Sequence, residues 1–223
     1  MMRLYHDLRA PNPRRVRMFL AEKGLLDQVE LVEVSIATHA NMTPAFLDKN
    51  PLGLVPVLEL PDGRTLRESM AICRYLEELH PAPSLFGADP WSRALIEQWN
   101  RHAELEVLVP VAQVFRNSHA FWHGRLRQAP EFAEIMRELV AVRMAWLDGE
   151  LATRPFLAGD HFTVADITLL CGLDFGKVSG IRVGDDTPIL STRLVDDSGG
   201  ISTGGRATAG SCGAARVSRS CTS

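Results

Sequence analysis

The chain has 223 residues, 46% of them hydrophobic, and a formal net charge of −3 at pH 7. This length and composition suit one or two domains with a substantial buried core. The weakly acidic charge, without a basic stretch, offers no surface for nucleic-acid phosphates or an anionic membrane, so we expect neither partner.

The spacing of the cysteines and the lack of a long apolar run indicate the cellular compartment of the protein. The four cysteines lie far apart with no C-x-x-C pair, so neither a zinc ribbon nor a dithiol redox site is predicted. No stretch approaches the roughly 20 apolar residues that span a bilayer, and no signal sequence is recognisable. We therefore expect a cytoplasmic protein with reduced thiols and no metal site. Cys73, among apolar neighbours, is expected to be a small buried core residue.

Strand and helix signals alternate over residues 1–80, which favours an open α/β sheet. Short strands are predicted at residues 2–6, 29–34 and 55–60. The sequence Pro61-Asp62-Gly63 is typical of a turn and leads into a further strand at 64–66.

Three helices are predicted between and after these strands. Asn12-Pro13 has the residues of an N-cap followed by a proline at the first helical position, and Gly24 suits the end of that helix. Thr43-Pro44 begins a short second helix, and Glu68-Ser69 begins a third. The resulting order, βαβ followed by α and ββα, is the thioredoxin-like arrangement.

Beyond the proline-rich linker at 81–83 the pattern becomes entirely helical. A long helix is predicted at 91–116, kinked by Pro110, and another at 131–151. Thr163-Val164-Ala165-Asp166 has the sequence of a capping box and predicts the start of a further helix. We therefore expect an all-helical second domain at residues 88–188.

The sequence changes character after Pro188. The last 35 residues contain seven serines and six glycines but no aromatic residue and no helical period. We expect residues 189–223 to be a disordered, atypical tail. A changed reading frame near residue 189 would explain the break, a hypothesis that resequencing of the coding region would test.

Three stretches, taken in order, resemble the glutathione S-transferase family. They are P-R-R-V-R at 13–17, N-P-L-G-L-V-P-V-L at 50–58 followed by R-E-S-M-A-I at 67–72, and F-L-A-G at 156–159 before the capping box. The resemblance covers residues 2–188. It implies a thioredoxin-like α/β N-terminal domain that binds glutathione, followed by an all-α domain that contributes a site for a small hydrophobic electrophile. It also implies a two-fold homodimer.

The resemblance assigns glutathione-binding roles to residues in the first domain. A cis bond between Val55 and Pro56 would let the Val55 backbone pair with the cysteinyl part of glutathione like an added strand; the alternative is a rigid start to the strand. Glu68 and Ser69, at a helix N-terminus, would bind the ammonium and carboxylate of the γ-glutamyl end, or only cap the helix.

Two residues before the second helix are candidates for the other end of glutathione. Its glycyl carboxylate needs a polar group from the loop that precedes that helix. Asn41 or His39 would supply that group, and the sequence does not choose between them.

The thiol needs a group that favours its ionised form, because a pKa of roughly 8.5 to 9 leaves mostly thiol at neutral pH. Well-known classes of the family place Tyr, Ser or Cys after the first strand, but residues 6–13 contain none. This resembles a bacterial and fungal subgroup in which the first helix's N-terminus supports the thiolate. Asn12 either donates to the sulfur or only caps its helix. Ser118 and His119, at the end of the long helix, either hold a water near the sulfur or are plain surface groups.

The expected activity is therefore conjugation of the glutathione thiolate to small hydrophobic electrophiles, with glutathione peroxidase activity as a further possibility and detoxification as the physiological setting. The alternative is a glutathione S-transferase-like interaction module that performs no chemistry, as the missing Tyr, Ser or Cys would allow. A glutaredoxin-like dithiol exchanger is disfavoured, because no cysteine stands at the start of the first helix.

Overall fold

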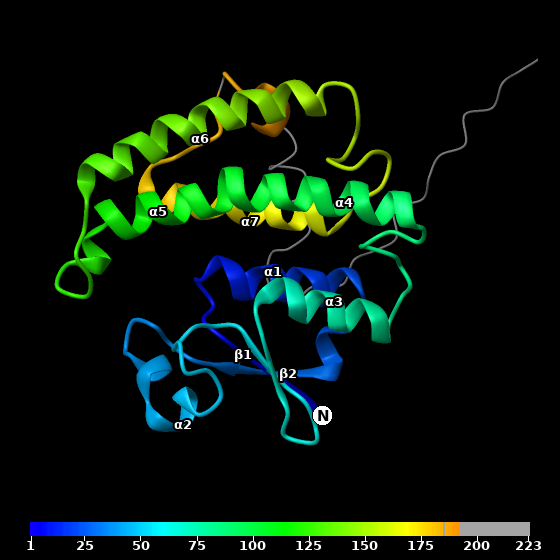
Figure 1. Cartoon of the computed structure of the whole chain (residues 1–223), viewed down its shortest axis with the longest axis vertical. Helices are drawn as coiled ribbons and strands as arrows, with labels where there is room; N and C mark the ends of the chain where they lie inside the picture. Colours follow the sequence, from blue (N-terminus) through cyan, green and yellow to red (C-terminus); the bar gives the residue numbers. More distant parts are fainter. Residues whose placement is uncertain (185, 192–223) are drawn as a thin grey trace, which may run out of the picture.

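A computed structural model describes residues 1–184 and 186–191, which form two domains (Figure 1). The first contains a four-stranded sheet in the order β2-β1-β3-β4. Its strands are β1 (Met2–His6), β2 (Val29–Glu33), β3 (Val57–Glu59) and β4 (Thr65–Arg67). β1 is parallel to β2 and antiparallel to β3, and β3 is antiparallel to β4. The thioredoxin-like fold is confirmed.

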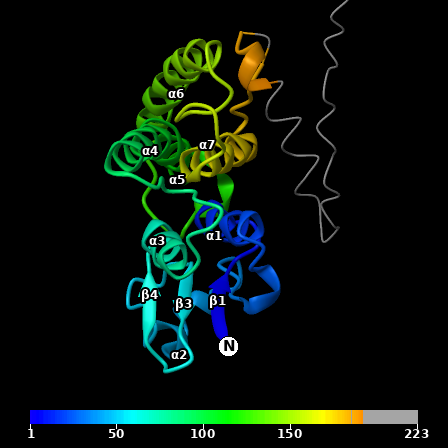
Figure 2. The same cartoon turned by 90° about the vertical axis from the view of Figure 1, so that its right-hand side faces the viewer.

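Helices cover both faces of this sheet because its strands alternate their side chains. Leu4 and Leu58 are fully buried on the face covered by α1 (Pro11–Glu22) and α3 (Ser69–Leu79), which lie between the sheet and the second domain (Figure 2). Their neighbours along the strands form a separate core on the opposite face, with the short helix α2 (Pro44–Leu47).

Several predicted boundaries in this domain shift by one or two residues. Residues 55 and 56 precede β3 instead of belonging to it. The helix α1 begins at Pro11 with Ala10 as its N-cap, so the predicted N-cap role of Asn12 is wrong. Ala10, with φ −79° and ψ 137°, has the extended conformation typical of a residue before proline, and the helix begins at this earlier proline, which places Asn12 inside the first turn. Gly24 does adopt the expected positive φ, at 66°.

The regular elements of the second domain are all helical within the described residues. Its elements are α4 (Pro90–His102), the π-helical segment η3 (Ala103–Leu108), α5 (Val109–Ser118), α6 (Pro130–Leu151) and α7 (Val164–Gly176). The predicted kink at Pro110 stays a prediction, but the backbone is π-helical directly before α5, in whose first turn Pro110 lies without an N–H to donate to the preceding turn. Short 3-10 turns occur at η1 (Leu26–Gln28), η2 (Ala40–Met42), η4 (Ala120–Trp122) and η5 (Lys177–Ser179).

The capping box at the start of α7 is confirmed. The Asp166 carboxylate accepts hydrogen bonds from the Thr163 amide at 2.8 Å and the Thr163 hydroxyl at 2.9 Å. Its other oxygen accepts from the Leu157 amide at 2.8 Å. This anchored helix packs directly on α1 and thus joins the two domains.

Ion pairs cross the domain interface beside α7. The fully buried Arg15 guanidinium lies 3.1 Å from the Glu104 carboxylate of η3. Arg14 also pairs with Asp174 of α7. Two buried Arg15 nitrogens, Nε and Nη2, have no acceptor in the described part of the chain, so Glu104 is the partner that compensates the guanidinium charge.

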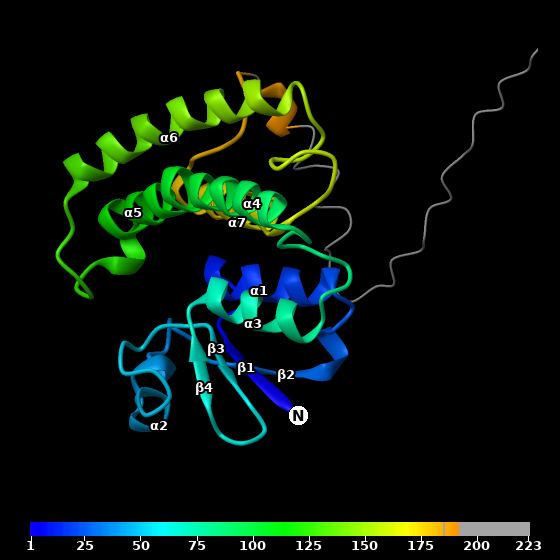
Figure 3. The same cartoon turned by 45° about the vertical axis from the view of Figure 1, so that its right-hand side comes forward.

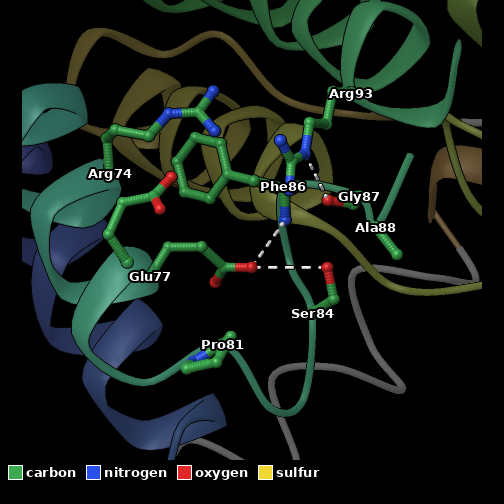
Figure 4. Close-up of a pocket in the computed structure, with 9 residues that line it drawn as sticks. Arg74, Glu77, Pro81, Ser84, Phe86, Gly87, Ala88 and Arg93 are labelled. Atoms are coloured by element: carbon green, nitrogen blue, oxygen red, sulfur yellow. Dashed lines mark hydrogen bonds between the residues drawn. The ribbon is translucent and has the colours of Figure 1, made fainter. Parts of the chain in front are cut away.

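The linker between the domains is tied to the first domain by a buried pair. Lys23 Nζ lies 2.5 Å from Glu77 and donates to the backbone carbonyls of His80 and Pro83. The Glu77 carboxylate accepts from the amides of Leu85 and Phe86. The pocket in Figure 4, with a volume of about 230 Å³, lies beside this linker, at the opposite end of α3 from Ser69.

The last described residues pack on the second domain. Residues 188–191 form a helical turn in which Leu190 is only 2% exposed. The amides of Ile189 and Leu190 both donate to the Asp148 carboxylate at 2.9 Å. Residues 189–191, which the sequence assigned to the tail, therefore belong to the packed domain. Residues 192–223 lie outside the described residues, and their disorder stays a prediction.

Candidate glutathione site

Val55 and the start of α3 lie at the same end of the β3–β4 hairpin. Val57 pairs with Arg67, so the chain two residues before Val57 and two residues after Arg67 emerges at one place. The Val55–Pro56 bond is cis, as predicted. Within the described residues, neither the N–H nor the C=O of Val55 has a backbone or side-chain partner. An extended ligand can therefore pair with this backbone.

Glu68 and Ser69 form the N-terminus of α3. Ser69 is its first residue and is 5% exposed, while Glu68 is its exposed N-cap and has no side-chain capping bond. Glu68 has a φ of 69°, a conformation that costs a non-glycine residue of order 1–3 kcal/mol. The first α3 amide with an acceptor among the described hydrogen bonds is that of Ile72, so within the described residues the preceding amides of the helix are unpaired, as a carboxylate ligand requires.

Asn41 and His39 lie in the loop between β2 and α2. Asn41 is buried, and its side-chain amide donates to the Gly53 carbonyl at 2.7 Å, so it anchors the loop before the cis bond. Its Oδ1 is buried and has no hydrogen-bond partner among the described residues. His39 is exposed and has a φ of 60°. Of the two candidates for the glycyl carboxylate, His39 has the more accessible side chain.

The start of α1 offers few donors for a thiolate. Pro11 and Pro13 have no N–H, and the amides of Ala10 and Arg14 donate to protein carbonyls at 3.3 Å. The Asn12 amide has no acceptor among the described hydrogen bonds, and its side chain is exposed. Asn12 is therefore the one residue of this turn with both a free backbone N–H and a free side-chain amide in the described structure.

Ser118 and His119 lie at the C-terminal end of α5, on the same side of the molecule as the start of α1 (Figure 1). The Ser118 hydroxyl donates to the Val114 carbonyl at 2.8 Å. His119 Nδ1 accepts from the Phe121 amide at 3.1 Å, which leaves Nε2 available. Their predicted role toward a water near the sulfur is not tested by these contacts and stays a prediction.

An aromatic cluster surrounds the end of α5. The Phe115 ring lies 4.8 Å from the His119 ring and 5.1 Å from the Phe175 ring, measured between centroids. It also contacts Phe121 and Trp122 of the following turn. The end of α5 is therefore packed mainly by aromatic rings.

Two loop residues near these candidates were missed by sequence reasoning. Asp7, after β1, accepts from the Ile36 amide at 2.8 Å, and Arg125, in the turn before α6, donates to the Ile36 carbonyl at 3.3 Å. An aspartate after a strand is a weak signal for loop anchoring, and nothing in the sequence relates Arg125 to residue 36.

The buried cysteines are not nucleophiles at neutral pH. Cys73 is fully buried, as predicted, and burial raises the pKa of its thiol far above the ordinary value. Burial also raises the pKa of the Cys171 thiol to about 11. Within residues 1–184 and 186–191, no cluster of three His, Cys, Asp or Glu side chains is arranged to hold a metal ion. Among the helices of those same residues, none has the length and apolar character to cross a membrane.

The fold and these residues define the class of protein, and comparisons with known families agree. The family model described as the glutathione S-transferase N-terminal domain matches residues 10–79, and that of the C-terminal domain matches residues 100–192. The chain belongs to the glutathione S-transferase family.

Relatives of several kinds are found within this family. Glutathione S-transferase 2 of Saccharomyces cerevisiae is 36% identical over 191 residues, which cover 85% of this chain and 82% of the yeast protein. The crystal structure of Gtt2 from Saccharomyces cerevisiae has a TM-score of 0.83 and 34% identity, and covers 88% of this chain and 95% of that one. The crystal structure of a glutathione S-transferase domain-containing protein from Marinobacter aquaeolei has a TM-score of 0.82 and 36% identity. The match covers 88% of this chain and 97% of that one.

Translation factors are also similar to the chain. A probable elongation factor 1-gamma 1 from Arabidopsis thaliana is 36% identical over 164 residues, which make up 70% of this chain. The aligned part is only 38% of the factor, so the chain spans little more than a third of that relative.

Proposed function

We propose that the protein is a glutathione transferase that joins the glutathione thiolate to small hydrophobic electrophiles. One observation carries the proposal: the unpaired backbone of Val55 and the open N-terminus of α3 at Ser69 emerge at the same end of the β3–β4 hairpin. The cysteinyl part of glutathione pairs with Val55, its glutamyl carboxylate binds the α3 amides and Ser69, and its ammonium faces Glu68.

The reaction requires a thiolate near the start of α1. The thiol releases its proton to solvent, and the sulfur attacks an electrophilic carbon, so that a C–S bond forms and the leaving group departs with its electron pair. We assign sulfur support to the amide groups of Asn12 and the positive end of the α1 dipole. A water held between Ser118 and His119 is a second source of support.

The same thiolate is expected to reduce organic peroxides. Its sulfur attacks a peroxide oxygen, the O–O bond breaks, and an alcohol leaves after it takes up a proton. A second glutathione converts the resulting sulfenic acid to the disulfide and releases water. This activity needs no residue beyond those already named.

The test is glutathione-dependent conjugation of a chloronitrobenzene, together with retention on glutathione resin. Replacement of both Glu68 and Ser69 by Ala should abolish retention and reduce kcat/KM, because the glutamyl end loses its partners. The substitution Glu78→Ala, at an exposed position near the other end of α3, is the control. Folded wild-type protein that neither binds the resin nor turns over substrate would contradict the proposal.

The alternative is a non-catalytic module that mediates protein contacts, and the similarity to elongation factor 1-gamma proteins favours it. Such a module does not need Glu68 and Ser69. Unchanged pull-down partners in the Glu68 and Ser69 double variant, combined with absent turnover by the wild type, would support this alternative.

We also expect a cytoplasmic homodimer that serves in detoxification. Large apolar side chains are exposed on α4 and η3, including Trp91 at 75% exposure and Leu105 at 47%. Leu52, in the loop before Val55, is 68% exposed. A second copy would cover such residues. Analytical ultracentrifugation of the wild type should give the dimer mass, and a monomer at micromolar concentration would contradict it.

A further inference from the structure

The loop between β2 and α2 is held from both domains at Ile36. The Ile36 amide donates to Asp7 Oδ2 at 2.8 Å, within the first domain. From the second domain, Arg125 Nη1 donates to the Ile36 carbonyl at 3.3 Å and Nη2 to the Ala37 carbonyl at 3.1 Å. In Figures 1 and 3 the turn between α5 and α6 reaches down toward this loop. We use the term cross-domain clamp for Asp7, Ile36, Ala37 and Arg125.

The turn that carries Arg125 is itself well ordered by side-chain contacts. The Arg125 guanidinium carbon lies 4.4 Å from the centroid of the Phe121 ring, and the Phe121 amide donates to His119 Nδ1. Gln128 donates to the carbonyls of Arg116 and His119 at 3.0 Å. Arg125 therefore extends from a turn that is held by several hydrogen bonds and by a cation–π contact.

The other end of the loop is fixed within the first domain. The Asn41 side-chain amide bonds the Gly53 carbonyl, and the Ala40 amide donates to the Ser35 carbonyl at 3.0 Å. Residues 37–39 lie exposed between these fixed points. His39, the candidate for the glycyl carboxylate, belongs to this exposed part.

We propose that Arg125 is a positioning residue: through the cross-domain clamp the second domain sets the position of residues 36–39 and thereby the affinity for glutathione. This inference rests on the proposed function, and it adds a residue from the second domain to a site otherwise built from the first. Arg125 acts on glutathione through the loop and is not assigned a direct contact.

The geometry suits arginine in particular. Its planar guanidinium presents two N–H groups to two successive carbonyls while its face stacks on Phe121, whereas a lysine ammonium is a point charge that cannot do both. Because the acceptors are neutral carbonyls, the contact should depend weakly on ionic strength, unlike a surface ion pair.

The experiment compares Arg125→Ala, Arg125→Lys and the control Arg127→Ala in the full chain. Arg127 lies in the same turn, is exposed, and has no hydrogen bond or ion pair with the described residues. Hydrogen exchange of residues 34–42 without glutathione reports on the loop, and calorimetric titration with glutathione reports on affinity. Stability is monitored by thermal unfolding.

Arg125→Ala should speed exchange within residues 34–42 and weaken glutathione binding about two- to tenfold, the range that a net hydrogen bond of ordinary strength gives. Arg125→Lys should lie between Ala and wild type, and Arg127→Ala should match wild type. Unchanged loop exchange in Arg125→Ala overturns the clamp. Faster exchange with unchanged affinity overturns the positioning role.

The two proposals fail separately. A wild-type protein that does not bind glutathione overturns the proposed function, and with it the role of Arg125 in glutathione affinity. Exchange in residues 34–42 is measured without ligand, so it still decides whether Arg125 holds the loop.

Discussion

Asn12 occupies the first turn of α1 between two prolines. At this position a substitution can distinguish an effect on helix stability from an effect on the proposed thiolate. A negative charge at a helix N-terminus stabilises the helix, whereas the same charge beside a thiolate opposes ionisation of the thiol. Among the described residues of this turn, Asn12 alone has both a backbone N–H and a side-chain amide without an acceptor, so under the proposed function it is the residue that would donate to the sulfur.

Asn12→Asp is therefore expected to change stability and activity in opposite directions. The free energy of unfolding should rise by about 0.3–1 kcal/mol, because the carboxylate meets the positive end of the helix dipole. Conjugation at neutral pH should slow, and its apparent thiol pKa should rise. Urea unfolding and the pH profile of kcat/KM measure the two effects. Equal activity of Asn12→Asp and wild type would remove Asn12 from the site.

His6, the last residue of β1, is buried next to the start of the site, and burial lowers the pKa of its imidazole. The nearby Arg17 guanidinium lowers it further, against the opposing effect of Glu33. Because the unfolded chain then binds the proton more readily, His6 opposes folding once the pH falls below its ordinary pKa of about 6.5.

His6→Gln should flatten this pH dependence. The free energy of unfolding of the wild type should decrease between about pH 7 and pH 5. The decrease should be smaller in His6→Gln, where only groups common to both proteins titrate. His123→Gln, at an exposed position, serves as the control. Urea midpoints at several pH values provide the measurement. An identical loss in the His6 variant and the wild type would show that another group titrates there.

At the scale of elements, two helices begin with capping boxes that differ in burial. Asp166 at α7 is buried and accepts three hydrogen bonds, from the Leu157 and Thr163 amides and the Thr163 hydroxyl. Asp89 at α4 accepts from the Trp91 and Ser92 amides at the surface, where water can replace it.

Replacing each carboxylate tests this difference. Asp166→Ala should reduce the free energy of unfolding by about 2–4 kcal/mol, because it leaves buried donors unsatisfied. Asp89→Ala should cost about 1 kcal/mol, as for an exposed cap. Denaturant unfolding followed by tryptophan fluorescence compares them. Similar costs for the two variants would show that burial of the α7 cap is unimportant.

The elements show how much the sequence reveals. The order of strands and helices and the α7 cap follow from local patterns of prolines, caps and apolar spacing, whereas the cis bond at Val55 was implied by the family resemblance. The sequence does not locate the N-cap of α1, because both Pro11 and Pro13 are suited to the first position of a helix. In the structure the helix begins at Pro11, and Ala10 is its N-cap. The anchoring of Ile36 by Arg125 was not predictable, because 89 residues separate them and only the packing of the two domains brings them together.

At the scale of the whole molecule, the domain interface contains a buried charge with one good partner. Arg15 of α1 is fully buried and reaches Glu104 in the π-helical segment η3. Two residues further along that segment, Glu106 pairs with Arg143 at 2.7 Å near the surface. Glu104 also pairs with the half-exposed Arg101 at 2.7 Å, an ion pair similar to that of Glu106 with Arg143, so the contact with buried Arg15 is what distinguishes the two glutamates.

Glu104→Ala should destabilise the protein by about 2–4 kcal/mol, because it leaves the Arg15 guanidinium buried and uncompensated. Glu106→Ala should cost no more than about 1 kcal/mol, as for an exposed ion pair. Urea unfolding of both variants tests the difference. If Glu104→Ala costs no more than Glu106→Ala, then water already reaches Arg15 in the native state.

The buried bonds of Lys23 and Glu77 bear on how substrates reach the interior. They join the end of α1, the end of α3 and the connecting segment, while the Leu85 carbonyl accepts from the Val164 amide of the second domain. A connection held by both domains resists a hinge motion at this end of the interface. Under the proposed function, a bulky compound would then enter at the opposite end, where the contacts of Arg125 with residues 36 and 37 are exposed to solvent.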